Sequence, residues 1–390
     1  MNHGKFVFSQ VISFIPNRIF DRLVKKHEGN KYVKHFSCWN QLCCMMFGQL
    51  SSRDSLRDLI TCVSPHKNKF FHLGFGKNVT RSNLSLANET RTYQIYEDLA
   101  YHLISVAQKN CFPDDEFLEK IEGSVYAFDS SVVDLCLNVF WWAKFRKEKG
   151  GIKLHTLLDV KTNIPVFVHI TTASVHDVNA MDELDYEVGG YYILDRGYPD
   201  FERLFIIALV GAYFVTRARK NFQFTIVHRA KVKRKKGVKS DQTINLKGFY
   251  PFKKYPEQMR RIRFYDSENK RHLVFLTNNF ELKAEDIALL YKYRWRIELF
   301  FKWIKQHLQV KSFWGTTVNA VKTQIYIAII TYATVMIIKN KMNTKYSNYE
   351  ALQIIGVALF DKTPLRDLLE KPVIQDFKEQ FNNQLKINLD

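Results

Sequence analysis

The chain has 390 residues, enough for two or three domains, and its 46% hydrophobic content excludes a largely disordered protein. Its 58 Lys and Arg residues against 39 Asp and Glu residues give a net charge of +19, which indicates a polyanionic partner, either nucleic acid or an anionic membrane surface. The apolar uncharged run 323–338 is shorter than the roughly 20 residues that a membrane span needs, so we expect a buried helix there and no membrane partner.

The cysteines and the N-terminus exclude two further classes of protein. The six cysteines include no C-x2-C pair and no histidines at zinc-finger spacing, so we expect reduced thiols rather than a structural metal or a disulfide framework. The first 20 residues lack a cationic start, a sustained apolar segment and a small-residue cleavage site, so we expect no export signal.

The first part of the chain, 1–123, is predicted to be a helical N-terminal DNA-binding region. Helical apolar periodicity runs through 39–50, 55–63 and 89–107, with a polar link at 77–88. Its scattered cations suit DNA contact, although the same pattern is typical of a solvated helical face.

From Ser124 onward the hydrophobic pattern changes to that of β-strands. The predicted order, β-β-β-α-β-α-β, favours a mixed sheet with helices on its faces, in which polar groups at strand ends gather into a site. The strands are expected at 124–135, 152–160, 164–173, 191–195 and 212–219, with a polar hairpin connection at 144–151 and helices at 177–187 and 200–210. We assign 124–216 as the first part of this core.

The segment 217–281 is predicted to be a β-rich basic insertion, because short strands alternate there with polar turns. Ten Lys or Arg residues and no acidic residue lie in 217–239. A charge run is usually a solvated loop, but within a strand-rich part of a basic protein we favour phosphate contact. The candidate contacts are Arg217, Arg219, Lys220, Lys233, Arg234, Lys235 and Lys236.

The segment 289–308, LLYKYRWRIELFFKWIKQHL, is predicted to be one continuous amphipathic helix. Tyr291, Arg294, Glu298 and Lys305 follow the pattern Y-x2-R-x3-E-x6-K and share an arc of roughly 60° on such a helix. We add Lys302 as a further candidate DNA contact. The opposite arc is apolar and suited to core packing: Tyr293, Ile297, Phe300, Phe301, Ile304 and Leu308. This helix belongs to a second part of the core, 282–340, followed by a helical tail, 341–390.

Two more carboxylates stand at strand ends. Asp129 lies at the end of the first predicted strand and Asp195 at the end of the fourth. Three carboxylates, these two and Glu298, crowd together as anions only around divalent cations, and Mg²⁺ or Mn²⁺ prefers such oxygen ligands. Two such ions are suited to phosphoryl transfer.

Each of these residues also has a purely structural explanation. Asp134 and Asp159 lie near Asp129 in the sequence and are alternative candidates for the site carboxylate. Either Asp195 or Asp200 is suited to cap the following helix. Lys153 and His155 alternate on one predicted strand. His155 is either a core histidine or a site residue that approaches the scissile phosphate, and for both residues we favour a place in the core or behind the metal ligands.

Four motifs together resemble the DDE transposases of bacterial insertion sequences that carry a YREK signature, the insertion-sequence-four family. They are FDSS around Asp129, GGIKLHTLLD, LDRGY around Asp195, and YKYRWRIELFFKWIK. The resemblance covers about Ser124 to Trp314, with weaker similarity in the N-terminal segments NKYVKHF, SLRDL and RSNLSLANETR.

The resemblance implies an α/β fold with an RNase H-like mixed-sheet core interrupted by the β-rich insertion, and helical N- and C-terminal regions. It implies Asp129, Asp195 and Glu298 as catalytic ligands of two Mg²⁺ ions, for which Mn²⁺ can substitute, and Tyr291, Arg294 and Lys305 as DNA-phosphate contacts.

The implied protein binds the terminal inverted repeats of an insertion sequence and performs cut-and-paste cleavage and strand transfer. The expected partners are double-stranded DNA at the transposon ends and target and a second copy of the chain in a homodimer, in the bacterial cytoplasm.

Some related transposases form a DNA hairpin whose flipped base stacks on an aromatic side chain. By residue type, the candidates here are Trp295, Trp303 and Trp314.

Two other functions remain open on the sequence. One is a transposase-derived DNA-binding protein that no longer performs chemistry, and the other is an RNase H-like nuclease without strand transfer.

Overall fold

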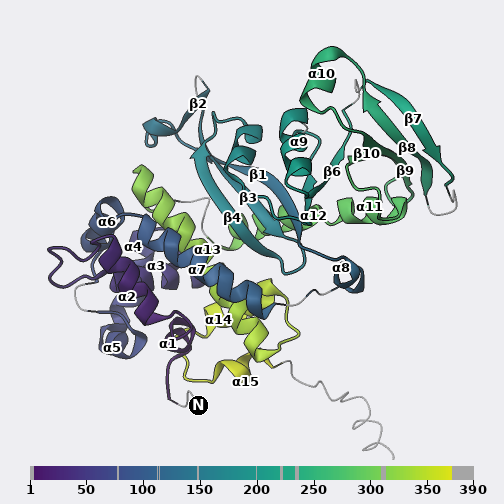
Figure 1. Cartoon of the computed structure of the whole chain (residues 1–390). Helices are drawn as coiled ribbons and strands as arrows, with labels where there is room; N and C mark the ends of the chain where they lie inside the picture. The colour runs from purple at the N-terminus through teal and green to yellow at the C-terminus, as the bar shows by residue number, and fades with distance from the viewer. Residues whose placement is uncertain are drawn as a thin grey trace, which may run out of the picture.

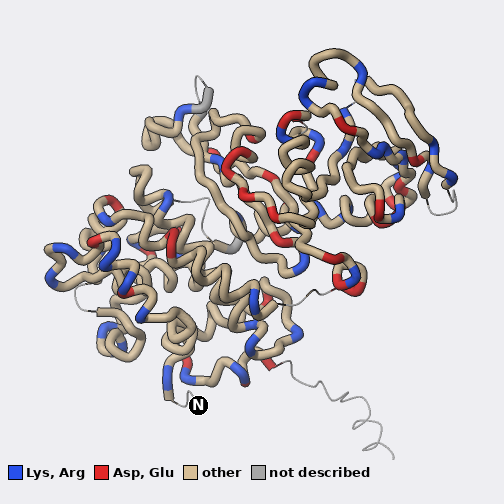
Figure 2. The backbone as a smooth tube through the Cα atoms, viewed as in Figure 1, with Lys and Arg blue, Asp and Glu red and all other residues tan. Residues whose placement is uncertain are grey.

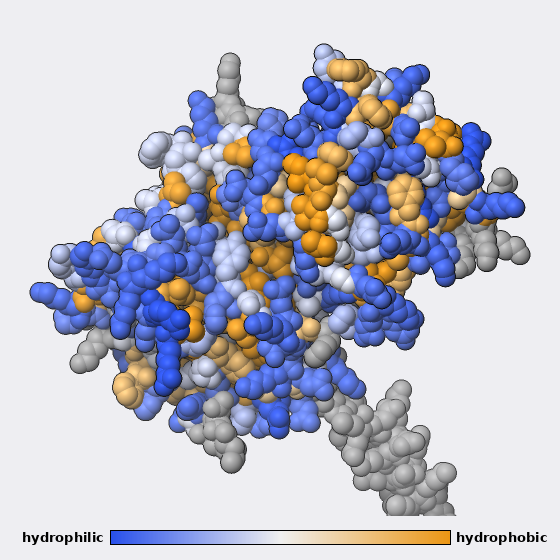
Figure 3. All heavy atoms as spheres, in the orientation of Figure 1, coloured by the Kyte–Doolittle hydropathy of each residue, from blue (hydrophilic) through white to orange (hydrophobic). Residues whose placement is uncertain are grey.

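The protein combines a body of helices with a large mixed sheet (Figure 1). The computed structural model describes residues 4–76, 79–111, 113, 115–146, 149–198, 200–219, 223–232, 237–308 and 313–370. Hydrophilic side chains cover most of the visible face of the helical body, with the apolar side chains largely inside (Figure 3).

Residues before the sheet form the helices that the sequence predicts. They are α1 (Val7–Ile12), α2 (Asn17–Lys26), α3 (Cys38–Leu50), α4 (Leu56–Val63), η1 (Ser64–Lys69), α5 (Phe70–Leu73), α6 (Arg81–Thr90), α7 (Gln94–Asn110) and α8 (Glu116–Lys120). The predicted polar link at 77–88 is wrong in part, because helix α6 begins at Arg81. The Thr80 side chain accepts a hydrogen bond from the Asn83 backbone and caps this helix, which periodicity alone did not reveal.

The C-terminal helices complete the same body. Helix α13 (Val318–Met342) packs on α7, α3 and α6, and is followed by α14 (Asn348–Val357) and α15 (Leu365–Leu369). Helix α13 is apolar and long enough to cross a membrane, but 94% of its most apolar window is buried inside the protein. Its apolar surface on all sides is therefore explained by its place in the core.

The sheet has ten strands among the described residues. Strands β1 (Val125–Leu135), β3 (Lys149–Asp159) and β4 (Ile164–Thr172) form an antiparallel meander, with the short β2 (Lys144–Arg146) beside β3. On the other side of β1, β5 (Tyr191–Leu194) and β6 (Tyr213–Arg217) run parallel to it. The order β4-β3-β1-β5-β6, three antiparallel strands followed by two parallel ones, is that of an RNase H-like core, and the predicted fold class is confirmed.

The strands of the predicted insertion continue the same sheet. Strand β10 (Arg271–Thr277) pairs with β6, and β9 (Met259–Asp266), β8 (Val238–Leu246) and β7 (Phe224–Ala230) follow outward. The short helix α10 (Phe249–Lys254) connects β8 to β9.

Helices cover both faces of the central strands. Residues Val125 and Ala127 of β1 face the core shared with α12 (Trp295–His307), α13 and α7, whereas Phe128 faces a second core with α9 (Phe201–Leu209). The segment predicted as a helix at 177–187 is a shorter 3₁₀ helix, η3 (Asp177–Glu183), on the α9 side.

The predicted continuous helix at 289–308 is wrong in one respect. It is divided into α11 (Ala284–Lys292) and α12, and at the junction Tyr293 and Arg294 donate their backbone N–H groups three residues back, to Leu290 and Tyr291. Aromatic contacts fix the two sides separately, because Tyr291 packs on Phe275 and Tyr293 stacks on Phe117. Periodicity cannot anticipate such tertiary anchors.

The outer strands are held to the core by a buried ion pair. Arg260 on β9 donates to both carboxylate oxygens of Asp241 on β8, at 3.0 and 2.7 Å, and also to the carbonyl oxygens of Asn279 and Leu282. Both charged side chains are nearly inaccessible to water. This arrangement joins β8 and β9 to the segment that leads into α11.

We predict that Arg260→Met destabilises the protein by about 3–5 kcal/mol, because it leaves the Asp241 carboxylate buried without its partner. The thermal unfolding midpoint measures the effect. Arg271→Met is the matched control on the same hairpin, since Arg271 pairs with Asp266 but is 55% exposed, and its loss should change stability by no more than about 1 kcal/mol. Equal midpoints for the two variants would contradict the assigned role of Arg260.

Candidate active site

The two aspartates lie side by side, but the prediction that Asp129 ends its strand is wrong, because β1 continues past it to Leu135 in its pairing with β3. Residues Phe128 of β1 and Leu194 of β5 are partners in the parallel pair, and Asp129 and Asp195 each follow by one residue. Ala127 and Ile193, two residues before them, both face the core shared with α12. Since side chains alternate along a strand, the two aspartates point to the α12 face.

The capping alternative applies to Asp200 rather than to Asp195. The Asp200 side chain accepts hydrogen bonds from the backbone N–H groups of Glu202 and Arg203 at the start of α9. Of the two rivals of Asp129, Asp134 is exposed, and Asp159 accepts hydrogen bonds from Lys161 and Thr162 in the turn after β3. Asp195 and Asp129 are therefore available to a site.

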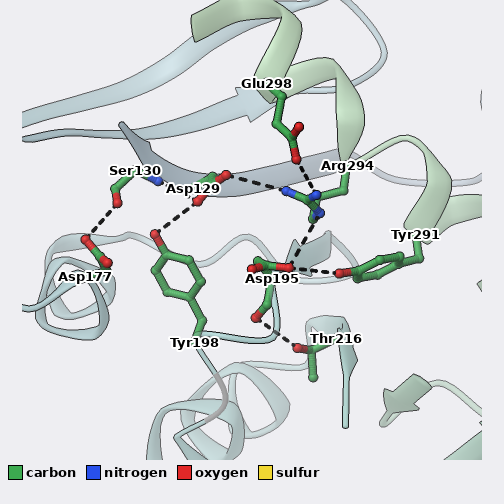
Figure 4. Close-up of polar contacts among 9 residues, drawn as sticks. All are labelled: Asp129, Ser130, Asp177, Asp195, Tyr198, Thr216, Tyr291, Arg294 and Glu298. Atoms are coloured by element: carbon green, nitrogen blue, oxygen red, sulfur yellow. Dashed lines mark hydrogen bonds and ion pairs between the residues drawn. The ribbon is translucent and has the colours of Figure 1, made fainter. Parts of the chain in front are cut away.

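Helix α12 brings Glu298 over the aspartates, and the end of α11 brings Tyr291 (Figure 4). The Tyr291 hydroxyl donates to Asp195 Oδ1 at 3.2 Å. Of the predicted apolar arc, Ile297, Phe300, Phe301, Ile304 and Leu308 are buried and Tyr293 is partly buried, so this arc fixes the helix to the core.

Arg294 lies in the middle of the three carboxylates (Figure 4). Its Nη2 atom pairs with Glu298, its Nη1 atom lies 3.5 Å from Asp129 Oδ2, and its Nε atom lies 3.9 Å from Asp195 Oδ1. The guanidinium thus offsets the mutual repulsion of three anions drawn from distant parts of the chain.

Burial sets the protonation of Asp129. It raises the pKa of this carboxyl to about 6, with the negative charges of Asp195 and Glu298 adding to the rise. The backbone N–H of Ser130 and the Arg294 guanidinium act in the opposite direction. A further positive charge at the site would favour the ionised carboxylate.

The donor chemistry of the three carboxylates suits a divalent ion, because hard oxygen ligands are those that Mg²⁺ and Mn²⁺ prefer. The arrangement of the three carboxylates around Arg294 does not suit a divalent ion. Within the part of the chain that the structure describes, no three His, Cys, Asp or Glu side chains stand where they could hold one ion together. The donors are present, but the guanidinium lies between them.

A polar network supports β1 from the opposite face. The Ser130 hydroxyl donates to Asp177 Oδ1 at 2.7 Å, and Lys153 Nζ lies 3.0 Å from the same oxygen and donates to the Val175 carbonyl at 2.6 Å. Lys153 thus contacts a neighbour of Asp129 through Asp177, while His155 is fully buried and bonds Thr171 at 2.9 Å. The structure places both residues behind the carboxylates rather than among them.

Three site neighbours were missing from the sequence prediction. The buried Tyr198 places its hydroxyl 3.5 Å from Asp129 Oδ1, and Thr156 pairs across from Asp129 in the sheet. The Thr156 hydroxyl is buried and has no hydrogen-bond partner among the described residues. Asp177 was treated only as a helix residue. Tyr198 stands in the LDRGY motif, whereas only the strand register reveals Thr156.

Several of the predicted DNA contacts lie around this site. Lys305 donates to the Val132 carbonyl on β1 at 2.6 Å, Lys302 is exposed on α12, Arg217 ends β6, and Arg219 donates to the Gly197 carbonyl at 3.2 Å. Basic residues also gather at the far tip of β7 and β8 (Figure 2). Lys220, Lys233, Arg234, Lys235 and Lys236 lie outside the described residues.

The three tryptophans proposed for base stacking differ in their exposure to solvent. Trp295 is 57% exposed and lines a cavity of 860 Å³ between α11, α12 and the β9–β10 hairpin. Trp303 and Trp314 are buried, and Trp303 packs edge-on against Tyr332. Only Trp295 among these three is placed to meet a ligand.

One known protein family matches most of this core. The protein family described as "Transposase DDE domain" matches residues 120–334, more than half of the chain, and a domain of unknown function matches residues 3–76.

Curated relatives carry related descriptions. The chain is 37% identical over 198 residues to the putative transposase y4zB of Sinorhizobium fredii, and 32% identical over 242 residues to the probable transposase for insertion sequence element IS5377 of Geobacillus stearothermophilus. These matches cover 49% and 60% of this chain, and 54% and 62% of the relatives' lengths.

A third relative is the putative transposase for insertion sequence element IS4SA of Synechocystis, 24% identical over 268 residues, with 66% of this chain and 71% of the relative covered. Among solved structures, a piggyBac transposase synaptic complex with hairpin DNA aligns with a TM-score of 0.45 and 11% identity, over 97% of this chain and 83% of that chain. The last similarity is too low to support an argument.

We predict that His155 makes the protein less stable in mild acid. Burial lowers its pKa from 6.5 to about 4, so between these values the unfolded chain binds a proton that the folded chain does not. Stability should therefore fall as the pH drops from 6.5 toward 4, by at most about 3 kcal/mol from this residue. His155→Gln should reduce the difference in unfolding free energy between pH 7.5 and 4.5.

The exposed His72 supplies the control for this measurement. His72→Gln should leave the pH dependence of stability unchanged. An unchanged pH dependence in His155→Gln would show that His155 is not held neutral by the fold.

Proposed function

Because the chain belongs to the transposase DDE domain family, we propose that it is a transposase that binds the terminal inverted repeats of an insertion sequence and catalyses strand cleavage and strand transfer. The convergence of Asp129 from the middle of β1, Asp195 from the end of β5 and Glu298 from the covering helix is the observation that carries the proposal. Metal-dependent phosphoryl transfer is the chemistry that such a set of carboxylates suits best.

These three residues would hold the divalent ions, Mg²⁺ or its substitute Mn²⁺. When bound, two such ions activate water or a 3′-hydroxyl group and stabilise the leaving oxygen of a phosphodiester. The chain itself places Tyr291 beside the carboxylates, where its hydroxyl can orient a phosphate group, and Arg294 among them, where its guanidinium balances their charge.

Cations near the site support the choice of DNA as substrate. Arg217, Arg219, Lys302 and Lys305 lie on β6, just after it and along α12, and the chain carries a net charge of +19. Such charges attract the phosphate backbone and release counterions on binding. We further propose that the protein acts on transposon ends and target as a homodimer, by cut and paste, in the bacterial cytoplasm.

Two other functions account for part of the same observations. A transposase-derived DNA binder would keep the cations without the chemistry, but it gives no reason for three converging carboxylates. A nuclease without strand transfer would use the carboxylates, and the capture of a target DNA by a pre-cut end distinguishes it from a transposase.

We predict that Glu298→Gln abolishes DNA cleavage and joining, because the amide removes one of three anionic ligands without changing the side-chain shape. Purified protein, DNA bearing the element's ends and Mg²⁺ should give nicked or joined products with the natural protein, and at least about 10³-fold less with the variant. Glu268→Gln, which removes only an exposed partner of Lys292, is the control. Full activity of Glu298→Gln while DNA is bound would refute the assignment.

We predict that Arg217→Gln weakens DNA binding and lowers the slope of log affinity against log salt by about 1, because one phosphate contact is lost. The loss should be similar for different DNA sequences, since a phosphate contact does not read bases. Lys345→Gln, an exposed cation after α13, removes the same charge far from the site and should leave the slope unchanged. Equal slopes for natural protein and Arg217→Gln would place Arg217 outside the interface.

A further inference from the structure

The position of Arg294 is unusual for a residue that is expected to hold DNA. Its side chain is only 16% exposed and it engages one oxygen of each of the three carboxylates, Asp129, Asp195 and Glu298. A guanidinium that faces inward to three anions is not presented to a phosphate group outside. In this arrangement Arg294 neutralises the site rather than binding a substrate.

The same carboxylate oxygens cannot serve the guanidinium and a divalent ion together. A cation at the centre of the carboxylates would lie beside the positive charge of Arg294, which would repel it. Consistently, no three potential ligands come together for one ion in the described ranges of the chain. Occupation by the guanidinium and occupation by divalent ions are therefore alternatives.

The present contacts of Arg294 do not use the full hydrogen-bonding capacity of its guanidinium. Its Nε atom is buried and has no hydrogen-bond partner among the residues that the structure describes, and its Nη1 contact with Asp129 is long, at 3.5 Å. A phosphate group accepts two parallel hydrogen bonds from a guanidinium and carries the charge to hold it. Arg294 also stands at the junction of α11 and α12, where the backbone bonds are already those of a tight turn.

We propose that Arg294 closes the carboxylate site in the DNA-free protein, and that a DNA phosphate group draws the guanidinium out so that the three carboxylates become available to divalent ions. DNA and metal ions then bind cooperatively, each raising the affinity for the other by the same factor. The protein without DNA holds ions weakly. This inference rests on the proposed function, because it requires DNA as the ligand that opens the site.

The first test measures Mn²⁺ binding to the full-length, DNA-free protein by calorimetry or by the electron paramagnetic resonance of free Mn²⁺. Arg294→Gln removes the competing charge and should bind Mn²⁺ at least about tenfold more tightly than the natural protein, within the range of typical coupling between sites. Lys292→Gln removes the same charge from the neighbouring helix α11, at an exposed residue that pairs with Glu268 rather than with the carboxylates, and its Mn²⁺ affinity should stay unchanged. Equal affinities for Arg294→Gln and the natural protein would overturn the proposal.

Arg294→Gln leaves three carboxylates without a positive partner and can therefore fail to fold. A second variant covers that case. Arg294→Lys keeps a positive charge, but an ammonium group cannot reach three carboxylates as a guanidinium does. Its Mn²⁺ affinity should lie between those of the natural protein and Arg294→Gln. Affinity equal to that of the natural protein in a folded Arg294→Lys variant would count against the closing role.

The second test adds a DNA duplex that carries the inverted repeat flanking the reading frame. Mn²⁺ affinity should rise in the natural protein and rise less in Arg294→Gln, which is already open. If the natural protein binds the duplex without any gain in Mn²⁺ affinity, the inference is wrong while the proposed function stands. If it binds no DNA, the proposed function fails, and the DNA-free measurements still report on Arg294.

Discussion

Three anionic side chains that share one place in a protein need a positive charge among them, and this requirement organises the centre of the molecule. Asp129 and Asp195 are neighbours because β1 and β5 pair in parallel with Phe128 opposite Leu194, so the repulsion between the two carboxylates is built into the sheet. Glu298 adds a third negative charge from α12. Among the residues that the structure describes, the Arg294 guanidinium supplies this positive charge. Its place among the carboxylates follows from electrostatic attraction rather than from helix geometry.

The rest of the fold holds these charges at fixed positions. The apolar side of α12 is buried against the strands, so Glu298 cannot withdraw from the aspartates without exposing large side chains such as Phe300 and Phe301. On the opposite face, the network of Ser130, Asp177 and Lys153 supports β1 next to Asp129. The backbone is thus held from both sides of the site, and Arg294 is the long cationic side chain among the three carboxylates.

The sequence predicted the strands, their mixed arrangement and the three carboxylates, because alternation of apolar residues and polar strand ends are local signals. It did not predict the break between α11 and α12, which depends on where Tyr291 and Tyr293 meet their aromatic partners. It also missed Thr156, since its closeness to Asp129 is a consequence of strand register. The placement of Arg294 among the carboxylates is likewise a matter of three-dimensional charge, and spacing along a helix suggested only an outward cation.

The break in the helix and the inward guanidinium have a common consequence. On one continuous helix, the four residues of the Y-x2-R-x3-E-x6-K pattern would present a single fixed arc, and Arg294 would point wherever that arc points. Because the backbone turns more tightly at Tyr293 and Arg294, the arginine is the N-cap residue of α12, with its N–H bonded to the Tyr291 carbonyl oxygen and its carbonyl oxygen accepting from the Ile297 N–H. Tyr291 stays with α11 and bonds Asp195, while Glu298 stays within α12. The junction therefore places Arg294 between the helix that positions Tyr291 and the helix that positions Glu298.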